Sequence, residues 1–275
     1  MKRALMIFGL CLLMVAMPFG SVLGRGQGVN IGDYVEFGSY MGTRVLWRVM
    51  ELKDGNPLLW SEYVLCAKCF DAAESGNVGE GADEVGKWGN SLWSKSNLRE
   101  WLNTMGKVNW STYPPASAAV VWGRNNYENE PGFLTGFSKA ERDMLVPTER
   151  VIIGSYFHRN IETTQDLVFL ATVEEVLNGG KWSLNNDSRI KFPTPTAMAK
   201  FNDMALIFKR GFGYQYFLMT PDDYYKSKVR AVDYGGDYPD EYSACHGCVG
   251  IVPAVQIANT EPKSGDGSKK NPWKF

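Results

Sequence analysis

One hydrophobic stripe marks a helix between residues 88 and 105. Its apolar positions follow the i, i+3, i+4, i+7 spacing of a single helical face: Leu98, Trp101, Leu102 and Met105. Ser94 or Ser96 can cap the start of this helix, and Gly106 follows its last apolar position. We expect this stripe to pack against strands that the chain supplies on either side.

The chain before this helix alternates between apolar and polar positions, as strands do. Three consecutive strands are predicted at residues 34–37, 45–52 and 58–65. Residues 53–56, Lys-Asp-Gly-Asn, contain the Asp-Gly pair that is typical of a two-residue hairpin turn. The pattern therefore predicts an antiparallel meander.

The second half of the chain mixes short helices with apolar strands. Capping-box patterns at 138–141 and 172–175, and a Thr-Pro pair at 194–195, open three short helices. Strands are predicted at residues 151–153, 166–171, 204–209, 214–220, 228–232 and 249–258. Because no linker divides the chain, the sequence predicts a single α+β domain of antiparallel strands with several short helices.

Both ends of the chain carry signals of their own. Residues 1–24 combine Lys2 and Arg3 with an apolar run and small residues at its end, the pattern of a cleavable signal peptide. An uncleaved membrane anchor is the alternative, although the apolar run is short for a span of ~20 residues. Residues 29–275 are predicted to form one secreted domain, with 262–275 as a Gly/Ser turn and terminal strand. We expect a secreted, cell-surface or periplasmic protein.

Charge and hydropathy exclude two classes of partner. Without Lys2 and Arg3, 27 basic residues face 30 acidic ones, and no basic stripe occurs, which argues against nucleic acid. No second apolar stretch is long enough to cross a bilayer, so no membrane span is expected after signal removal. A glycan or a surface protein is the expected partner.

The aromatic residues, 13% of the chain, have two interpretations. Large rings fill cores well, and flat rings beside polar groups also suit ligand contacts such as stacking on sugars. The second interpretation singles out two tryptophans near the central helix, expected to be exposed, and a Tyr/Asp-rich loop before the last apolar strand. The candidate ligand-binding residues are Trp88, Trp93, Asp233, Tyr234, Asp237, Tyr238 and Tyr242.

Four cysteines lie outside the predicted signal peptide, as two Cys-x-x-Cys pairs: Cys66, Cys69, Cys245 and Cys248. In an exported chain an even number of cysteines indicates disulfides, in which case no cofactor is expected. Two such pairs that meet in space could instead hold zinc through four thiolates. A thioredoxin-like redox pair is a third alternative, but a strand rather than a helix follows Cys248.

Signals for hydrolytic catalysis are weak. The only two histidines are His158 and His246, and no Gly-x-Ser-x-Gly motif occurs. Acidic residues such as Asp222 and Asp223 could serve a glycosidase only if two carboxylates faced each other across a substrate. We therefore assign no catalytic residue.

The order of several motifs resembles a known family. These motifs are GDYVEFGSYMG, RVLWRVM, LREWLN, FSKAERDML, TTQDLVFLATVEEV, YFLMTP and GIVPAV. Their order is similar to that of the bacterial domain-of-unknown-function family 6273, found in secreted and surface proteins. The resemblance covers nearly the whole chain after the signal. It implies a fold like that of C-type lectins and of the formylglycine-generating, or sulfatase-modifying, enzymes, and it implies no activity.

The sequence predicts a non-catalytic binding module for a glycan or a protein. The alternative, suggested by the resemblance, is a metal-thiolate enzyme of formylglycine-generating type, with copper or zinc at the four cysteines. A structural envelope protein whose aromatic residues fill the core is the third hypothesis. Two features depart from the family pattern: Pro253 lacks a preceding arginine, and the Cys-x-x-Cys pairs are additional.

Overall fold

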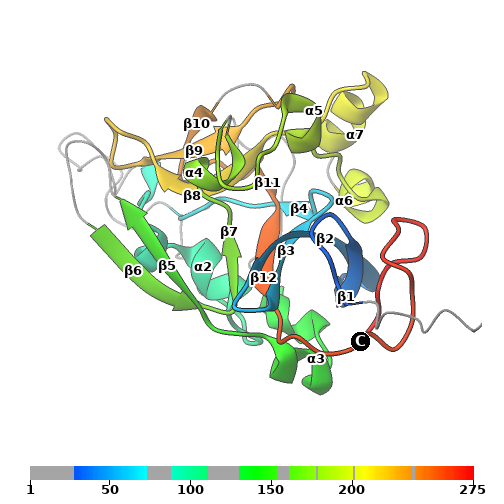
Figure 1. The fold of residues 1–275 in the computed structure, drawn as a ribbon. Coiled ribbons are helices and arrows are strands. Elements are labelled where there is room, and N and C mark those ends of the chain that lie inside the picture. Colours follow the sequence, from blue (N-terminus) through cyan, green and yellow to red (C-terminus); the bar gives the residue numbers. More distant parts are fainter. Residues whose placement is uncertain are drawn as a thin grey trace, which may run out of the picture.

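Two five-stranded sheets and a two-stranded hairpin, with short helices around them, make up the fold (Figure 1). The computed structural model describes residues 28–72, 88–110, 130–153, 161–177, 179–200, 202–236 and 239–275. The predicted signal peptide, residues 1–24, lies outside these ranges. The mixed helix and sheet composition confirms the α+β prediction.

The first sheet contains the predicted meander. Its strands, in spatial order, are β1 (Tyr34–Tyr40), β2 (Thr43–Lys53), β3 (Asn56–Ser61), β12 (Pro253–Gln256) and β7 (Val168–Leu170), all antiparallel to their neighbours. The β2–β3 turn has φ values of 53° at Asp54 and 78° at Gly55. Two consecutive positive φ angles match the twist of the flanking strands, as the Asp-Gly pair predicts.

The second sheet shares its chain with the first. Its strands, in order, are β10 (Pro239–Ser243), β9 (Lys228–Val232), β8 (Tyr216–Pro221), β11 (Gly250–Ile251) and β4 (Cys66–Ala67). Only β8 and β11 are parallel among its neighbouring pairs in the described residues. The predicted strand at 249–258 is split at Val252, so that β11 belongs to one sheet and β12 to the other. This crossing joins the two sheets covalently.

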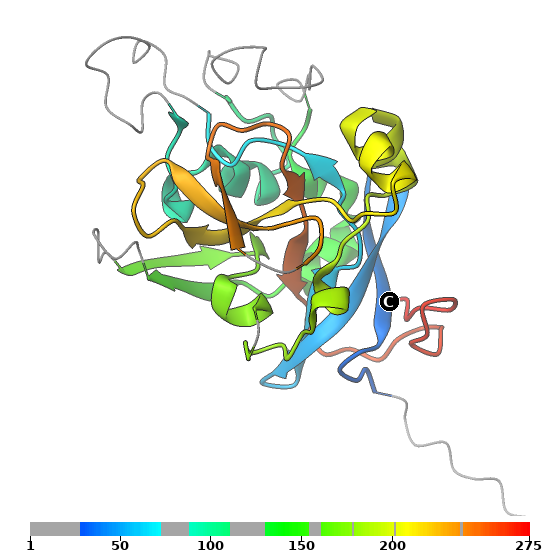
Figure 2. The same cartoon turned by 90° about the horizontal axis from the view of Figure 1, so that it is seen from above.

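A hairpin and the helices surround the sheets. The hairpin pairs β5 (Thr148–Ile153) with β6 (Ile161–Asp166). The helices are η1 (Trp93–Lys95), α2 (Asn97–Leu102), η3 (Phe133–Gly136), α3 (Lys139–Met144), α4 (Val173–Val176), α5 (Asn186–Arg189), α6 (Pro195–Lys200) and α7 (Asn202–Lys209). Seen from above, α6 and α7 lie on the opposite side of the molecule from β5 and β6 (Figure 2).

The central helix is shorter than its pattern predicts. Ser96 caps α2 by accepting a hydrogen bond from the Arg99 backbone N–H, which confirms one of the two predicted caps. Leu98, Trp101 and Leu102 are buried, but the helix ends at Leu102. Met105 lies beyond that end with 51% of its surface exposed, so its predicted place on the stripe is wrong.

The prediction of a strand at residues 204–209 is also wrong, because these residues belong to α7. Met204 is fully buried and Ile207 is partly buried, whereas Phe208 is 44% exposed. Burial at i and i+3 suits a helix with one side against the protein. A short apolar run does not by itself distinguish a strand from a helix. Residues 204–209 adopt the helix that follows α6 and lies beside it.

Most tryptophans fill the core. The side chains of Trp47, Trp60, Trp93 and Trp101 are at most 1% exposed, and Trp110, Trp182 and Trp273 are also buried. Phe70 packs against the Trp93 ring with centroids 5.7 Å apart. The aromatic content is therefore explained largely by packing.

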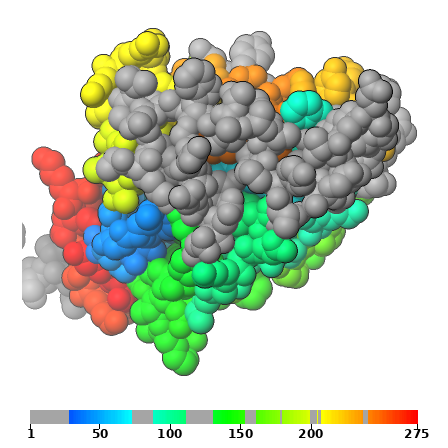
Figure 3. All heavy atoms as spheres, turned by 180° about the vertical axis from the view of Figure 1, so that it is seen from behind, coloured from blue at the N-terminus to red at the C-terminus, as the bar shows by residue number. Residues whose placement is uncertain are grey.

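The C-terminal segment returns to the first strand. Trp273 forms a parallel bridge with Val35, and its indole N–H donates to Asp33 Oδ2 at 2.8 Å. Trp273 is only 5% exposed. Figure 3 shows this segment beside the first strands at the molecular surface. The buried Trp273 ring thus anchors the C-terminal segment to β1.

Replacing the cap of α3 tests the local part of this fold. Ser138 accepts a hydrogen bond from the Glu141 N–H at 3.2 Å, and Glu141 Oε2 accepts one from the Ser138 N–H at 2.8 Å. Ser138→Ala should lower the free energy of unfolding by about 1 kcal/mol in urea titrations, because the Glu141 N–H at the start of the helix loses its acceptor. Lys139→Ala, at an exposed neighbour, is the control. Equal effects of the two substitutions would contradict the role of the cap.

Candidate binding site

The turn between β1 and β2 positions an aromatic wall. Met41 and Gly42 have φ values of 50° and 78°, so the chain reverses within two residues after Tyr40. The Tyr40 ring meets the Trp101 ring edge-on, with centroids 5.8 Å apart, and lies 6.0 Å from the Phe133 ring. The hairpin, α2 and η3 therefore meet at Tyr40.

A buried ion pair lies directly behind this wall. The Lys68 side chain is 0% exposed, and its Nζ lies 2.7 Å from Glu130 Oε2. The same carboxylate oxygen accepts a hydrogen bond from the Tyr40 hydroxyl at 3.0 Å. Lys68 Nζ also lies 4.4 Å from the centre of the Trp101 ring. A buried ammonium group requires such compensation, since an isolated charge is costly in a low-dielectric interior.

The ion pair borders a cleft with a volume of about 370 Å³. The residues that line it come from the end of β1 with the turn after it, and from η3 with the segment before it: Ser39, Tyr40, Met41, Gly42, Glu130, Pro131, Gly132, Phe133, Thr135 and Gly136. Its volume lies within the range of small-ligand pockets, ~300–1,000 Å³. Glu130 is 15% exposed at its side chain, so the carboxylate is held from inside and still reaches the surface.

The protonation state of Tyr40 follows from its surroundings. Burial raises the pKa of Tyr40, and the nearby Cys66 and Glu130 raise it further. The phenol therefore stays protonated and donates its hydrogen to Glu130. The cleft combines aromatic and apolar walls with one carboxylate, a combination that suits a ligand with hydroxyl groups on one edge and an apolar face.

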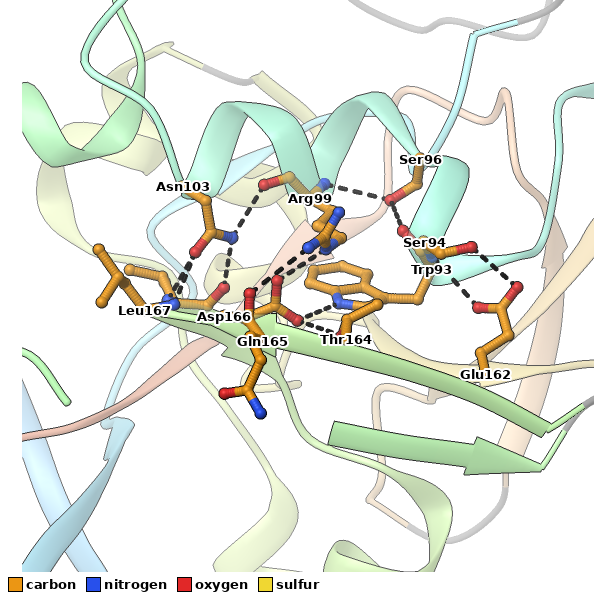
Figure 4. A network of polar contacts seen from close by, with 11 residues as sticks. Trp93, Ser94, Ser96, Arg99, Asn103, Glu162, Thr164, Gln165, Asp166 and Leu167 are labelled. Atoms are coloured by element: carbon orange, nitrogen blue, oxygen red, sulfur yellow. Dashed lines mark hydrogen bonds and ion pairs between the residues drawn. The ribbon is translucent and has the colours of Figure 1, made fainter. Parts of the chain in front are cut away.

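Trp93, expected to be exposed, is fully buried. Its indole N–H donates to Asp166 Oδ2 at 2.8 Å, and Arg99 Nε donates to Asp166 Oδ1 at 2.7 Å (Figure 4). The Thr164 hydroxyl donates to the same carboxylate at 2.6 Å. The prediction of an exposed Trp93 is therefore wrong, because the residue attaches η1 and α2 to the end of β6.

Of the other sequence-predicted ligand residues, Trp88, Asp233, Tyr234 and Tyr242 are described, and none of them lines the cleft. Trp88 is 42% exposed, and its carbonyl accepts a hydrogen bond from the Cys245 N–H at 2.8 Å. The Tyr234 ring meets that of Tyr214 edge-on, and the Tyr242 ring lies 5.4 Å from that of His246.

The acidic members of that loop are only partly described. Asp233 accepts a hydrogen bond from the Gly235 N–H at 3.0 Å, within the turn after β9. Asp237 and Tyr238 lie outside the described residues. Burial, followed by the charge of Asp240, raises the pKa of Tyr242.

Cys66, Cys69, Cys245 and Cys248 are all buried, and the described residues contain no disulfide between them. Their two segments meet, as expected, because β4 and β11 are adjacent strands. In the described residues no group of three or more histidine, cysteine, aspartate or glutamate side chains is arranged to hold a metal ion. Cys66 lies on β4 near Tyr40, whereas Cys69 lies beyond the end of this strand.

Tyr40, Lys68 and Glu130, the three polar residues at the cleft, were not predicted from the sequence. Lys68 lies between two cysteines, and alternation from β4 could have placed it on the same face as Cys66. Glu130 follows an irregular stretch without periodicity, so no local signal identified it. Tyr40 lies three residues beyond the strand predicted at 34–37, because β1 continues to Tyr40. Glu130 is 90 residues from Tyr40 and 62 residues from Lys68 in sequence.

A second cavity, of about 290 Å³, lies beside α4. Its lining includes a buried pair in which Arg150 donates two hydrogen bonds to Glu175, at 2.8 and 2.6 Å. Glu175 Oε2 also accepts a hydrogen bond from the Thr172 N–H in the capping box of α4. Because Arg150 and Glu175 bind each other and Glu175 also caps α4, the structural role of this pair explains its burial.

Comparison with known proteins gives one match. A protein-family model described as "Domain of unknown function (DUF6273)" matches residues 54–259. No curated protein and no solved structure matches the chain. Within the parts of the chain that the structure describes, no helix is both long enough and apolar enough to span a bilayer.

Proposed function

The chain belongs to the DUF6273 family, and from this premise we propose that it is a non-catalytic binding module that recognises a glycan in the cleft beside Tyr40. The single observation that supports this most is the Glu130 carboxylate, presented at the cleft by the buried Lys68 and flanked by aromatic rings. Aromatic faces contact the apolar side of a sugar ring, and a carboxylate accepts hydrogen bonds from its hydroxyls.

The charges of the cleft favour a neutral, hydroxyl-rich ligand. Lys68 and Glu130 neutralise each other, so the site offers neither a net positive charge for phosphate nor a net negative charge for a cation. Tyr40 is turned toward Glu130 and remains protonated. We extend the proposal to an exported, surface-exposed protein, for which the support is the signal-like pattern of residues 1–24.

Glycan-array screening followed by calorimetric titration tests this proposal. Thr135 is exposed and lines the cleft, so Thr135→Trp should obstruct it while leaving the Lys68–Glu130 pair in place. Glu130→Gln should weaken binding about tenfold or more, because a hydrogen bond to a charged group contributes about 1.5–3 kcal/mol. Tyr224→Ala, at a tyrosine that is 66% exposed elsewhere, is the control and should bind normally.

The same titrations distinguish the cleft from the region named by sequence. Glycan binding that survives Thr135→Trp but is lost in Trp88→Ala or Tyr242→Ala would move the site to the neighbourhood of Cys245. The absence of binding to any glycan would overturn the proposed ligand class. Near-ultraviolet circular dichroism of each variant verifies that its aromatic core is intact.

A further inference from the structure

The end of α7 is an exposed stretch in which two phenylalanines flank two basic residues. Residues 208–212 read Phe-Lys-Arg-Gly-Phe, and all five are exposed. Phe208 is 44% exposed and Phe212 is 57% exposed. Figures 1 and 2 both place α7 at the periphery of the molecule. Two large apolar rings therefore lie beside two cations at one edge of the fold.

Packing of the helix holds Phe208 in place. Met204 is fully buried and Ile207 is partly buried, so α7 is fixed against the protein one turn before its end. The Phe208 ring meets the Phe192 ring edge-on, with centroids 6.0 Å apart. Phe208 is therefore held by a neighbouring ring while almost half of its surface remains exposed.

The turn after α7 presents Phe212. The Arg210 and Gly211 N–H groups donate to carbonyl groups of α7 at 3.0 and 2.9 Å. Gly211 has a φ of 79°, which redirects the chain at the end of the helix. Gly213 is buried, and a Cβ atom there would lie 2.6 Å from Ile190 Cγ2, so the chain packs tightly on the core directly after Phe212. The exposed ring thus stands on a backbone that is fixed on both sides.

The two basic side chains are uncompensated. Among the residues that the structure describes, neither Lys209 nor Arg210 forms an ion pair or a side-chain hydrogen bond. A cation in the last turn interacts favourably with the helix dipole, which accounts for Lys209. The dipole does not account for Arg210, which lies beyond the helix, or for the two exposed rings. The combination indicates a partner that takes up apolar rings and positive charge together.

We propose that residues 208–212 dock the protein on an anionic lipid surface. Aromatic rings bind there by entering the boundary between the headgroups and the acyl chains. Lysine and arginine side chains beside such rings reach the lipid phosphates, because their apolar stems lie along the membrane while the charge stays in water. This inference goes beyond glycan recognition in the cleft and does not depend on it.

Size and shape favour a bilayer over a second protein. A stable protein interface buries ~800 Å² on each side, whereas two phenylalanine side chains supply only ~150–250 Å² each, even when fully exposed. A bilayer accepts a protruding segment without matching its shape, and it supplies both an apolar layer and negative charge.

Co-sedimentation of the full chain with lipid vesicles tests this proposal. The vesicles contain phosphatidylglycerol and phosphatidylcholine in equal amounts, or phosphatidylcholine alone, and the lipid is titrated at low and at high salt. The apolar run within residues 1–24 can bind lipid by itself, so the wild type is compared with variants of the same chain. We expect the wild type to bind the anionic vesicles more tightly, and added salt to weaken this binding.

Two double variants separate the contributions of charge and of the rings. Lys209→Gln with Arg210→Gln should weaken binding to anionic vesicles about 30-fold and leave binding to neutral vesicles unchanged, since each basic residue contributes about fivefold. Phe208→Ser with Phe212→Ser should weaken binding to both kinds of vesicle by about tenfold or more, because the apolar area that enters the membrane is lost.

Matched controls remove the same groups elsewhere. Lys263→Gln with Lys270→Gln removes two exposed lysines of the C-terminal segment and gives the same net charge as the basic double variant. Tyr224→Ser removes a ring that is 66% exposed. Both controls should bind as the wild type does. Circular dichroism verifies folding, and Phe212→Ser alone is used if the loss of the contact between Phe208 and Phe192 disturbs the fold.

Three outcomes would overturn the proposal. The first is that the wild type does not bind anionic vesicles. The second is that the variants in residues 208–212 bind as tightly as the wild type, which would assign binding to another part of the chain. The third is an equal loss of binding in Lys263→Gln with Lys270→Gln, which would show that only net charge matters.

Discussion

Lys191→Met is expected to stabilise the protein at pH 6 by about 1–4 kcal/mol, the gain seen when buried charges are replaced by apolar groups of similar volume. The Lys191 side chain is 3% exposed, and its Nζ lies 3.7 Å from the centre of the Trp60 ring. The nearest carboxylate is Glu62, at 4.0 Å. Glu62 keeps a second partner in the variant, because Lys269 Nζ lies 2.7 Å from it.

The advantage of this variant should depend strongly on pH. Burial lowers the pKa of Lys191 to about 7 in the folded protein, opposed by Glu62 and assisted by the charges of Arg48 and Lys269. An unfolded lysine titrates near ~10.4. Between these values the unfolded chain binds one more proton, so the free energy of unfolding of the wild type rises with pH by up to about 1.4 kcal/mol per unit. Below pH 7 both states are charged, and the full cost of burying the ammonium group remains.

Urea titrations of both proteins between pH 6 and 9.5 measure this difference. The gain from Lys191→Met should shrink by about 3 kcal/mol across this range, because the wild type loses its buried charge while the variant has none. Lys139→Met, at a lysine whose side chain is 82% exposed, should show no such trend. A constant difference between wild type and Lys191→Met would show that the buried lysine stays charged.

Asp166→Ala should destabilise the protein by about 3–5 kcal/mol. Its carboxylate is fully buried and accepts hydrogen bonds from Trp93, Arg99 and Thr164. Removing it leaves the buried indole N–H of Trp93 without its acceptor and breaks the pair with Arg99, whose guanidinium loses its charge partner. Asn103 at the end of α2 still accepts hydrogen bonds from the Leu167 and Val168 N–H groups, which follow β6.

Glu162 offers a matched control for this substitution. It belongs to the same strand and accepts hydrogen bonds from Ser94 at the exposed end of the network. Glu162→Ala should change the free energy of unfolding by only about 0.5 kcal/mol. Chemical denaturation at neutral pH measures the change in the free energy of unfolding for both variants. A loss below 1 kcal/mol in Asp166→Ala would mean that solvent replaces the carboxylate, contrary to the burial seen here.

Local patterns predicted the elements whose determinants lie within a few residues of one another. The Asp54-Gly55 turn, the capping box at Ser138 and the Ser96 cap are confirmed, because each depends on backbone groups at most four residues away. Periodicity failed for residues 204–209, where a short apolar run is compatible with both a strand and a helix.

The candidate site could not be predicted in the same way. The bond between Tyr40 and Glu130 joins residues 90 positions apart, and that between Lys68 and Glu130 joins residues 62 apart. Aromatic residues and carboxylates in a loop suggested a site near Tyr242, because composition identifies residue types but does not show which side chains face a cavity. Trp93 shows the same limit, since the acceptor that its buried indole N–H needs is Asp166, far along the chain.

By itself, the sequence determined the α+β class, the family, the first meander and the capped short helices. Each of these depends on contiguous residues or on the order of motifs along the chain. Only the tertiary structure decided that the last apolar run divides at Val252 between two sheets, and that Lys68 lies behind a cleft rather than at the surface. These outcomes depend on which distant strands pair. Pairing is set by the combined burial of the whole core, which no local segment of the chain contains.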